Sequence, residues 1–342
     1  RFSTVPQAGL NDRRGYQPRG RGLGGSSLIN AMLYVRGHTR DYDEWAALGC
    51  EGWSWDDVLP WFRKSEDNIR GADDLHGRGG PLQVCDQNWT RPINQAFLKA
   101  CEQSGYRQND DFNGPVQEGA GVYQTTQFWN GPKRGERCSA SRAYLGPAKG
   151  RSNLSVMTGA QVLRIVVDRG RAVGVELAGK GIVRAEREVI LSAGAIGSPR
   201  LLQLSGIGPA DHLRALGLPV VLDQPGVGSN FHDHLDLFVI AECTGPHTYD
   251  RFAKPHMSAL AGLQYLLTRR GPVASSLFET GGFWYADPDA RSPDIQFHLG
   301  LGTGIEHGVV SMPQGGITLN SCYLRPRSRG SVRLQSADPA QA

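Results

Sequence analysis

Residues 22–30 read GLGGSSLIN, a glycine-rich turn that runs directly into small and apolar residues. Successive backbone N–H groups at such a turn, at the start of a helix, attract phosphate, and the missing side chains let a nucleotide approach the backbone. We therefore predict a phosphate-binding turn that leads into a helix. Taken alone, the string is equally typical of a flexible surface turn. A phosphate-loop ATPase is disfavoured because no Gly-Lys-Ser or Gly-Lys-Thr follows the glycines.

The composition around this turn is that of a packed protein with an excess of glycine. The chain has 342 residues, of which 39% are hydrophobic, 20% are charged and 45 are glycine. Lys and Arg number 37 against 33 Asp and Glu, so the net charge is only +4. This small excess does not indicate nucleic-acid binding, which requires a clustered basic face. The length predicts two domains, or one large α/β domain with a second layer.

Cysteine spacing and hydropathy indicate the cellular compartment of the protein. The 6 cysteines stand singly, without a Cys-x-x-Cys pair that would start a zinc or redox site, so we expect reduced thiols. No run approaches the roughly 20 apolar residues of a membrane helix, and no signal peptide opens the sequence. We predict a cytoplasmic protein without a transmembrane segment, and peripheral contact with the inner membrane stays open.

The first half of the chain predicts helices and one long loop. A capping box, Ser54-x-x-Asp57, predicts a helix that reaches about residue 66. Residues 92–104 have helical apolar spacing, with a proline at the start and a glycine just past the end. Residues 109–137 show no sustained period, so we expect a loop region that forms a substrate-facing wall.

The second half begins as a small antiparallel meander and continues as a strand, glycine turn and helix. Apolar and β-branched runs predict the meander, and a continuous apolar run at 188–192 predicts a buried strand before a helix that starts at Ser198-Pro199. Residues 245–282 are expected to form a second substrate wall. The meander strands are predicted at 154–157, 161–168 and 172–177, further helices at 209–216 and 258–270, and further strands at 219–222, 295–299 and 316–333.

One polar segment invites a metal interpretation. In an extended chain, His232, His234 and Asp236 would point to the same side, and imidazole and carboxylate ligands suit zinc or iron. No third cluster completes a site of the required ligand count, so a hydrogen-bonded polar loop is the simpler interpretation. A serine hydrolase is disfavoured because the chain has no Gly-x-Ser-x-Gly.

Two long segments together carry a family resemblance. Residues 20–38, followed by Asp41-Tyr42-Asp43-x-Trp45, closely resemble the first signature of the glucose-methanol-choline (GMC) flavin oxidoreductases, and residues 194–209 resemble the second. Segments 226–234 and 324–330 are also similar to family segments. The resemblance covers nearly the whole chain, and it is strongest to choline dehydrogenase-like and aliphatic alcohol dehydrogenases.

The resemblance implies an α/β fold of mixed α+β character. It implies a partial FAD-binding Rossmann-like domain and a second, substrate-binding domain that contains an antiparallel sheet. In these terms, residues 1–50 are an FAD-binding segment and 51–150 a helical and loop part that borders the substrate domain. Residues 151–235 continue the FAD-binding domain with the meander and the strand-glycine-helix unit, and 236–342 form an incomplete substrate-binding domain.

FAD is the cofactor that the resemblance implies. In such enzymes, the segment matching residues 22–27 lies against the pyrophosphate and the ribityl chain, and the segment matching 30–33 passes beside the flavin ring. The position of Val162 contacts the adenine end, and residues 193–194 lie near the dinucleotide. The implied cofactor-binding residues are Gly22, Gly24, Gly25, Ser26, Ser27, Asn30, Ala31, Met32, Leu33, Val162, Ala193 and Gly194.

The implied activity is the FAD-dependent oxidation of a CH–OH group in a small alcohol or a choline-like substrate. In the family, a histidine takes the hydroxyl proton while hydride passes to flavin N5. The G-x-G-x-x-G string and the histidine-bearing C-terminal segment of the family are not in this sequence. We therefore expect an internal fragment that is inactive alone and binds FAD poorly, and we assign no catalytic residue and no metal.

Two other classes of function stay open at this point. One is a non-catalytic remnant or binding module on the same scaffold. The other is a metal-dependent hydrolase that uses His232, His234 and Asp236. The sequence specifies neither the alcohol nor the electron acceptor, because the expected substrate walls follow no readable pattern.

Overall fold

The computed structural model describes residues 2–303 and 315–341, and the chain divides into two compact units. Unit 1 comprises Arg1–Pro18, Ser152–Asp233 and Pro326–Ala342. Unit 2 comprises Arg19–Arg151 and His234–Arg325. Within the described residues, no helix combines the length and the apolar character needed to cross a membrane. All six cysteines are free thiols, as their spacing predicted.

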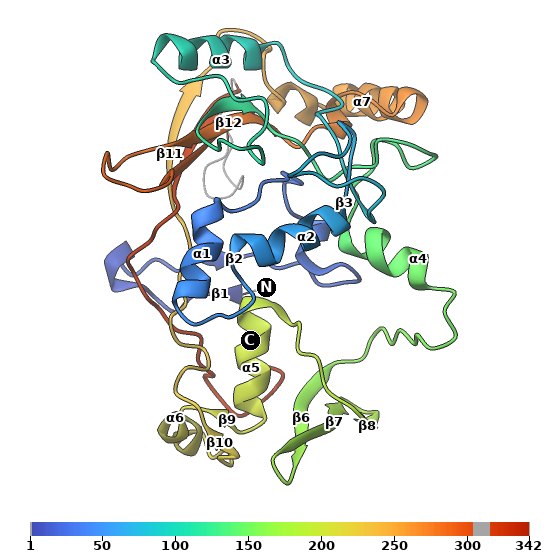
Figure 1. Cartoon of the computed structure of the whole chain (residues 1–342), viewed down its shortest axis with the longest axis vertical. Coiled ribbons are helices and arrows are strands. Elements are labelled where there is room, and N and C mark those ends of the chain that lie inside the picture. Colours follow the sequence, from blue (N-terminus) through green and yellow to red (C-terminus); the bar gives the residue numbers. More distant parts are fainter. Residues whose placement is uncertain (1, 304–314, 342) are drawn as a thin grey trace. The chain divides into compact units, whose positions relative to one another are not determined.

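Unit 1 contains the predicted meander, with one strand exchanged. β6 (Val162–Asp168), β7 (Arg171–Leu177) and β8 (Gly181–Arg184) form an antiparallel sheet in that order, drawn in green in Figure 1. Arg169 and Gly170 both have positive φ (48° and 78°), which suits the tight turn between β6 and β7. The strand predicted at 154–157 does not form, and β8 is the third strand instead.

The predicted buried strand at residues 188–192 is wrong. These residues form no strand, and the side chain of Ile190 is 79% exposed. A buried parallel strand needs neighbours on both sides, and no described strand of unit 1 pairs with this segment. The helix that follows, α5 (Gly194–Leu204), begins earlier than predicted, so that Pro199 lies inside it. α5 packs against β6, and the Ile165 N–H donates to Ser205 Oγ at 2.8 Å.

Short elements complete unit 1. A helix, α6, forms inside the predicted range 209–216 and ends before Gly217, whose φ is +71°. The strand predicted at 219–222 is reduced to a two-residue pairing with the segment after α5. The bounds are β1 (Phe2–Ser3), η1 (Ala8–Leu10), β2 (Tyr16–Gln17), β9 (Ile207–Gly208), α6 (Ala210–Ala215) and β10 (Leu222–Asp223).

Unit 2 is built on a five-stranded antiparallel sheet in the order β11-β14-β13-β12-β5. Only two of its strands were predicted, and the strand predicted at 316–333 ends at Tyr323, shortly before Pro326, which cannot donate to a ladder. β5 interrupts the expected loop at 109–137. The strands are β5 (Gly119–Val122), β11 (Leu235–Glu242), β12 (Phe278–Trp284), β13 (Ile295–Gly300) and β14 (Gly316–Tyr323).

An aromatic cluster forms the core beside this sheet. The rings of Phe112 and Tyr123 lie 4.9 Å apart between centroids, and Phe283 lies 5.4 Å from Phe112. Leu33 and Val35, from the segment that follows the glycine-rich turn, pack against this cluster. Their burial fixes that segment to the sheet, because alternate residues of an extended chain face the same side.

Three helices of unit 2 form where their sequence signals predicted them, near 54–66, 92–104 and 258–270, whereas the helix at Thr39–Ala47 was not predicted. The Ser54–Asp57 capping box forms in both directions at the start of α2. The helix predicted at 258–270 begins three residues earlier, at Pro255, and ends with Arg269 in the left-handed region at φ 56°. The bounds are α1 (Thr39–Ala47), α2 (Trp55–Ser65), α3 (Ile93–Gln103), α4 (Gly146–Ala148), α7 (Pro255–Thr268), the 3-10 turns η2 (Gly25–Leu28), η4 (Asp250–Ala253) and η5 (Pro272–Ala274), the π-turn η3 (Ser141–Leu145), and the parallel pair β3 (Glu66–Asn68) and β4 (Leu82–Val84).

The predicted fold class is confirmed at the level of mixed helix and sheet. Unit 2 contains the expected antiparallel sheet, and unit 1 contains the meander with the helix that packs on it. Several strands of unit 2 were not predicted, because their apolar runs contain glycines and polar residues.

Candidate functional site

Residues 22–33, here called the glycine loop, do not lead into an α-helix as predicted. They make one 3-10 turn, η2, and then run extended toward the aromatic core. Gly24 and Gly25 have φ values of +109° and +54°, which an L side chain rarely adopts. A Cβ at Gly24 would lie 3.1 Å from Ser141 Oγ, whereas a Cβ at Gly25 would meet nothing within 4 Å. The loop is therefore packed on one side and open on the other.

The open side of the loop presents backbone donors. Among the hydrogen bonds of the described residues, none uses the N–H of Leu23, Gly24 or Ser26, whereas the Gly25 N–H donates to Gly22 O at 3.0 Å. Leu23 and Ser26 are exposed residues, so their N–H groups face solvent, and free donors beside glycines form a geometry that can receive an anionic ligand. This geometry is compatible with the phosphate-binding interpretation, which stays a prediction.

Ser27 fixes the shape of this loop. Its hydroxyl donates to Gly24 O at 2.6 Å and accepts from the Ala140 N–H at 2.9 Å. This one side chain thus closes the turn and ties it to the segment that begins η3. The two serines of the motif differ in role, because among the described residues Ser26 Oγ accepts only from the Gly20 N–H, at 3.2 Å.

Met32, at the far end of the loop, has an unusual backbone. Its φ is +63° although it is not glycine, and its side chain is buried. The Met32 N–H donates to Asn30 Oδ1 at 3.2 Å, and Met32 O accepts from the Thr126 N–H at 2.8 Å. Backbone strain of this kind persists only where the surroundings enforce it, and it is concentrated at ligand sites.

The structure brings nine of the twelve predicted cofactor residues together in unit 2. The other three lie in unit 1, where Val162 begins β6 and Gly194 begins α5, which packs on β6. The prediction that both groups hold one nucleotide stays a prediction. The nine residues of the glycine loop are Gly22, Gly24, Gly25, Ser26, Ser27, Asn30, Ala31, Met32 and Leu33.

The hydrolase alternative gains no support from the geometry. Within residues 2–303 and 315–341, no three His, Cys, Asp or Glu side chains are grouped so that they could hold a metal ion. Asp236 lies in β11, opposite Cys322 of β14.

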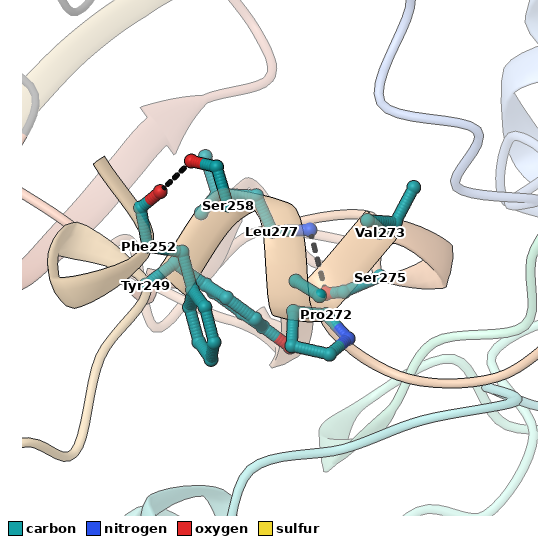
Figure 2. Close-up of a pocket in the computed structure, with 8 residues that line it drawn as sticks. Tyr249, Phe252, Ser258, Pro272, Val273, Ser275 and Leu277 are labelled. Atoms are coloured by element: carbon teal, nitrogen blue, oxygen red, sulfur yellow. Dashed lines mark hydrogen bonds between the residues drawn. The ribbon is translucent and has the colours of Figure 1, made fainter. Parts of the chain in front are cut away.

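A cavity of about 400 Å³ lies in unit 2, within the range 245–282 that was predicted as a substrate wall. η4, α7 and η5 form its walls, and its lining is mostly apolar. Figure 2 shows the ring of Tyr249 reaching across the cavity toward Pro272 and Ser275. The lining residues are Tyr249, Phe252, Ser258, Ala261, Pro272, Val273, Ser275 and Leu277.

Behind the polar end of this cavity lies a fully buried carboxylate, Glu279. Its Oε1 accepts from Ser275 Oγ at 2.6 Å and from the Tyr249 hydroxyl. Its Oε2 accepts from the Arg91 N–H at 2.8 Å and from the Asn94 amide. Because all four partners donate, the arrangement suits an acceptor-only carboxylate. Burial, followed by the charge of Glu279, raises the pKa of the Tyr249 hydroxyl above its usual range.

No described Lys, Arg or His forms an ion pair with Glu279, and the Arg91 guanidinium instead donates to the carbonyls of Pro246 and His247. The cavity therefore combines apolar walls with a negative charge one side chain behind its surface. Sequence reasoning missed Glu279. The only signal was a single acidic residue inside the apolar run 277–284.

A short segment joins the glycine loop to the cavity. Thr126 donates from its N–H to Met32 O at 2.8 Å. The next residue, Gln127, is 2% exposed, and its amide donates to Ala274 O at 2.9 Å, in the η5 wall of the cavity. The strained end of the loop and the cavity wall are therefore attached to neighbouring residues of one strand-like segment.

A buried ionic network supports the extended segment after the loop. Arg36 Nη2 donates to Glu66 Oε2 at 2.7 Å, and His76 contacts Glu66 Oε1 at 3.2 Å and Asp111 Oδ2 at 2.8 Å. The hydrogen bonds to Asp111 and then to Glu66 raise the pKa of His76 to about 9. His76 is therefore charged near neutral pH and holds two carboxylates together.

We expect this network to make stability depend on alkaline pH. The folded pKa of His76, about 9, exceeds its ordinary value of 6.5, so the folded state binds more protons. The stabilisation should be complete below pH 6.5 and lost as the pH rises through 9. Urea unfolding of the wild type between pH 6 and 10 should show this decline, and His76→Gln should show a flatter profile. Equal slopes for both proteins would contradict the assignment.

Comparison with known proteins shows the family of the chain. A family model described as GMC oxidoreductase matches residues 4–236. An oxygen-dependent choline dehydrogenase of Rhizobium johnstonii is 42% identical over 99% of this chain, and the mitochondrial choline dehydrogenase of Homo sapiens is 43% identical over 99%. The chain spans 61% and 57% of the length of these two relatives.

The solved structures agree as well. An FAD-dependent oxidoreductase from Chaetomium thermophilum superposes with a TM-score of 0.86 at 25% identity, over 100% of this chain and 67% of that one. The family match includes the glycine loop and the second glycine segment, which forms α5. The resemblance found in the two glycine segments is thereby confirmed, and the chain belongs to the GMC oxidoreductase family.

Proposed function

We propose that this chain forms part of an FAD-dependent alcohol oxidoreductase whose substrate is a small cationic alcohol of the choline type. FAD is the cofactor of its family. The observation that carries the proposal is the glycine loop, whose unpaired N–H groups and open side at Gly25 suit a nucleotide. Both relatives named above are choline dehydrogenases.

The residues of the glycine loop fit the cofactor. Unpaired donors at Leu23, Gly24 and Ser26 would hold its phosphate oxygens, and the absent side chain at Gly25 leaves room for close approach. The strained backbone at Met32 fixes the direction of the next N–H and C=O groups, where the ring would lie. When bound, FAD supplies the acceptor for the hydride that the alcohol carbon loses.

The cavity in unit 2 supports the cationic substrate class. Its aromatic and apolar walls, Tyr249 and Phe252 among them, suit methyl groups, and rings of this kind attract quaternary ammonium groups. The Glu279 carboxylate, behind Tyr249 and Ser275, adds a negative charge that favours a cation. A neutral alcohol of the same shape would gain only the apolar contacts.

The chain's own residues thus bind and orient, and we assign none of them as the base. Gln127 holds the cavity wall at Ala274, and its neighbour Thr126 holds Met32. This connection keeps the bound alcohol and the cofactor loop in a fixed relation, which is how positioning lowers a reaction barrier. The absence of turnover and the weak FAD binding expected for the 342-residue chain by itself stay predictions.

The test compares choline with its neutral isostere, 3,3-dimethylbutan-1-ol. The complete gene product, reconstituted with FAD, should oxidise choline with a kcat/KM about 30-fold higher, since a charge pair at about 8 Å is worth about 2 kcal/mol at an effective dielectric constant of about 20. Flavin reduction without oxygen, followed at 450 nm, reports the first turnover. Equal kcat/KM values would overturn the cationic substrate class, and absence of FAD binding would favour a non-catalytic binding module.

A further inference from the structure

Arg137 contacts the glycine loop with a single nitrogen. Its Nη1 donates to Asn30 O at 2.7 Å, to Asn30 Oδ1 at 2.5 Å and to Ser27 O at 3.3 Å. Two of these acceptors, Ser27 O and Asn30 O, are backbone carbonyls at the end of the η2 turn, where carbonyls lose their helical partners. A cation at this end of a helical turn is electrostatically favoured. Arg137 therefore caps the turn that forms the cradle.

Arg137 forms no ion pair with any described carboxylate. The adjacent carboxylate, Glu136, pairs instead with Arg142 and with Arg269. Burial lowers the pKa of the Arg137 guanidinium. The contacts that offset this desolvation are those to the glycine loop.

The segment that carries Arg137 is itself anchored to the rest of unit 2. Residues 126–138, here called the clamp hairpin, turn back at 129–135, with the Phe128 N–H donating to Glu136 O at 2.9 Å and the Cys138 N–H to Thr126 O at 2.9 Å. The hairpin also accepts the Tyr265 hydroxyl at Gly135 O, 3.1 Å away. Tyr265 belongs to α7, which also contributes to the wall of the cavity.

The two arms of the clamp hairpin hold the glycine loop at two points. From one arm, Thr126 donates to Met32 O with both its N–H and its hydroxyl. From the other, Arg137 donates to Ser27 and Asn30, and Asn30 Oδ1 in turn accepts from the Met32 N–H at 3.2 Å. The left-handed conformation of Met32 is therefore enforced from both sides.

We infer that Arg137 is a positioning residue, which holds the glycine loop in its cradle conformation before the nucleotide binds. The inference rests on the proposed function for the identity of the ligand. Without Arg137, the carbonyls of Ser27 and Asn30 lose their donor, and Asn30 is free to release Met32. The glycine loop should then be less ordered in the apoprotein. Because FAD binding has to restore the loop conformation, the affinity for FAD should be lower.

The experiment has one arm without FAD and one with it. In the first arm, hydrogen–deuterium exchange of the apoprotein should show amides of residues 26–33 exchanging about tenfold faster in Arg137→Ala. Arg134→Ala is the matched control, because Arg134 is an exposed arginine of the same hairpin whose only described bond is from its backbone N–H. It should exchange like the wild type. Unchanged exchange in Arg137→Ala would overturn the inference.

In the second arm, the Kd for FAD is measured by the quenching of flavin fluorescence in the complete gene product. Arg137→Ala should raise the Kd about tenfold or more, and millimolar guanidinium should restore most of the loss, without the same effect on Arg134→Ala. The thermal midpoint of the apoprotein should change little. Arg137→Lys keeps the charge on one compact group and replaces the alanine variant if that variant does not fold. Its Kd for FAD should lie between the wild-type value and the tenfold higher value expected for Arg137→Ala.

The outcomes separate the inference from the proposed function. An equal rise of Kd in both alanine variants would overturn the inference, because it would show a simple effect of charge. A wild type that binds no FAD would overturn the proposed function, and the exchange arm would still decide the role of Arg137.

Discussion

Glu279→Gln is expected to lower kcat/KM for choline by about 30-fold and to change kcat/KM for 3,3-dimethylbutan-1-ol by less than about threefold, because only the charge term of about 2 kcal/mol is removed. The amide has nearly the shape of the carboxylate. Its oxygen can face the Arg91 N–H and the Asn94 amide, and its NH2 can donate to the hydroxyls of Tyr249 and Ser275, which rotate to accept. The cavity should therefore keep its form and lose its charge.

Two further variants make this result specific. Asp294→Asn changes another carboxyl that is 2% exposed and accepts from the N–H groups of Ala286 and Asp287, away from the cavity lining. It should leave the ratio between the two alcohols unchanged. Glu279→Ala, in contrast, leaves four donors unpaired at a fully buried position, and we expect it to lose several kcal/mol of stability. A Glu279→Gln enzyme that still prefers choline by the wild-type ratio would refute the role of the charge.

Elements that depend on neighbouring residues were predictable from the sequence. The Ser54–Asp57 capping box formed in both directions because both partners lie within one helical turn. The β6–β7 hairpin formed because its turn residues, Arg169 and Gly170, adopt positive φ next to two β-branched runs. In both cases a few adjacent residues contain all the physical information that the element needs.

The failures have a common physical origin in distant partners. Residues 188–192 have the composition of a buried strand, but a strand also needs neighbours, and a local pattern cannot supply them. β12 was missed for the opposite reason. Its two central glycines weaken the strand pattern, yet a Cβ at Gly281 would lie 2.7 Å from the ring of Tyr123, so the packing of a residue far away in sequence requires glycine there.

The candidate site divides in the same way. The glycine loop could be found because its residues are contiguous, although the expected helix is only a 3-10 turn. Glu279, Gln127 and Arg137 could not be found, because each is a single polar residue whose role depends on what it contacts in three dimensions. The left-handed backbone of Met32 was also invisible, since nothing in its residue type indicates positive φ.

Met32→Ile is expected to raise the Kd for FAD at least about 30-fold, since a β-branched residue in the left-handed region costs about 2 kcal/mol or more. The native φ of Met32 is +63°, and it is enforced by Asn30 and Thr126. With isoleucine, the residue can move to an ordinary extended conformation, which breaks the bonds to Asn30 and Thr126. If it keeps the left-handed conformation instead, the backbone strain destabilises the glycine loop. Fluorescence titration of FAD into the complete gene product measures the effect.

Met32→Leu is the matched control at the same position. Leucine has nearly the volume of methionine and no branch at Cβ, so it should adopt the left-handed backbone at no greater cost than methionine. It should cost less than about 1.5 kcal/mol of stability and leave the Kd for FAD within about threefold. Met32→Gly should bind FAD nearly as well as the wild type, because glycine adopts positive φ without strain. If Met32→Ile and Met32→Leu bind FAD equally well, the left-handed backbone at Met32 has no part in holding the cofactor.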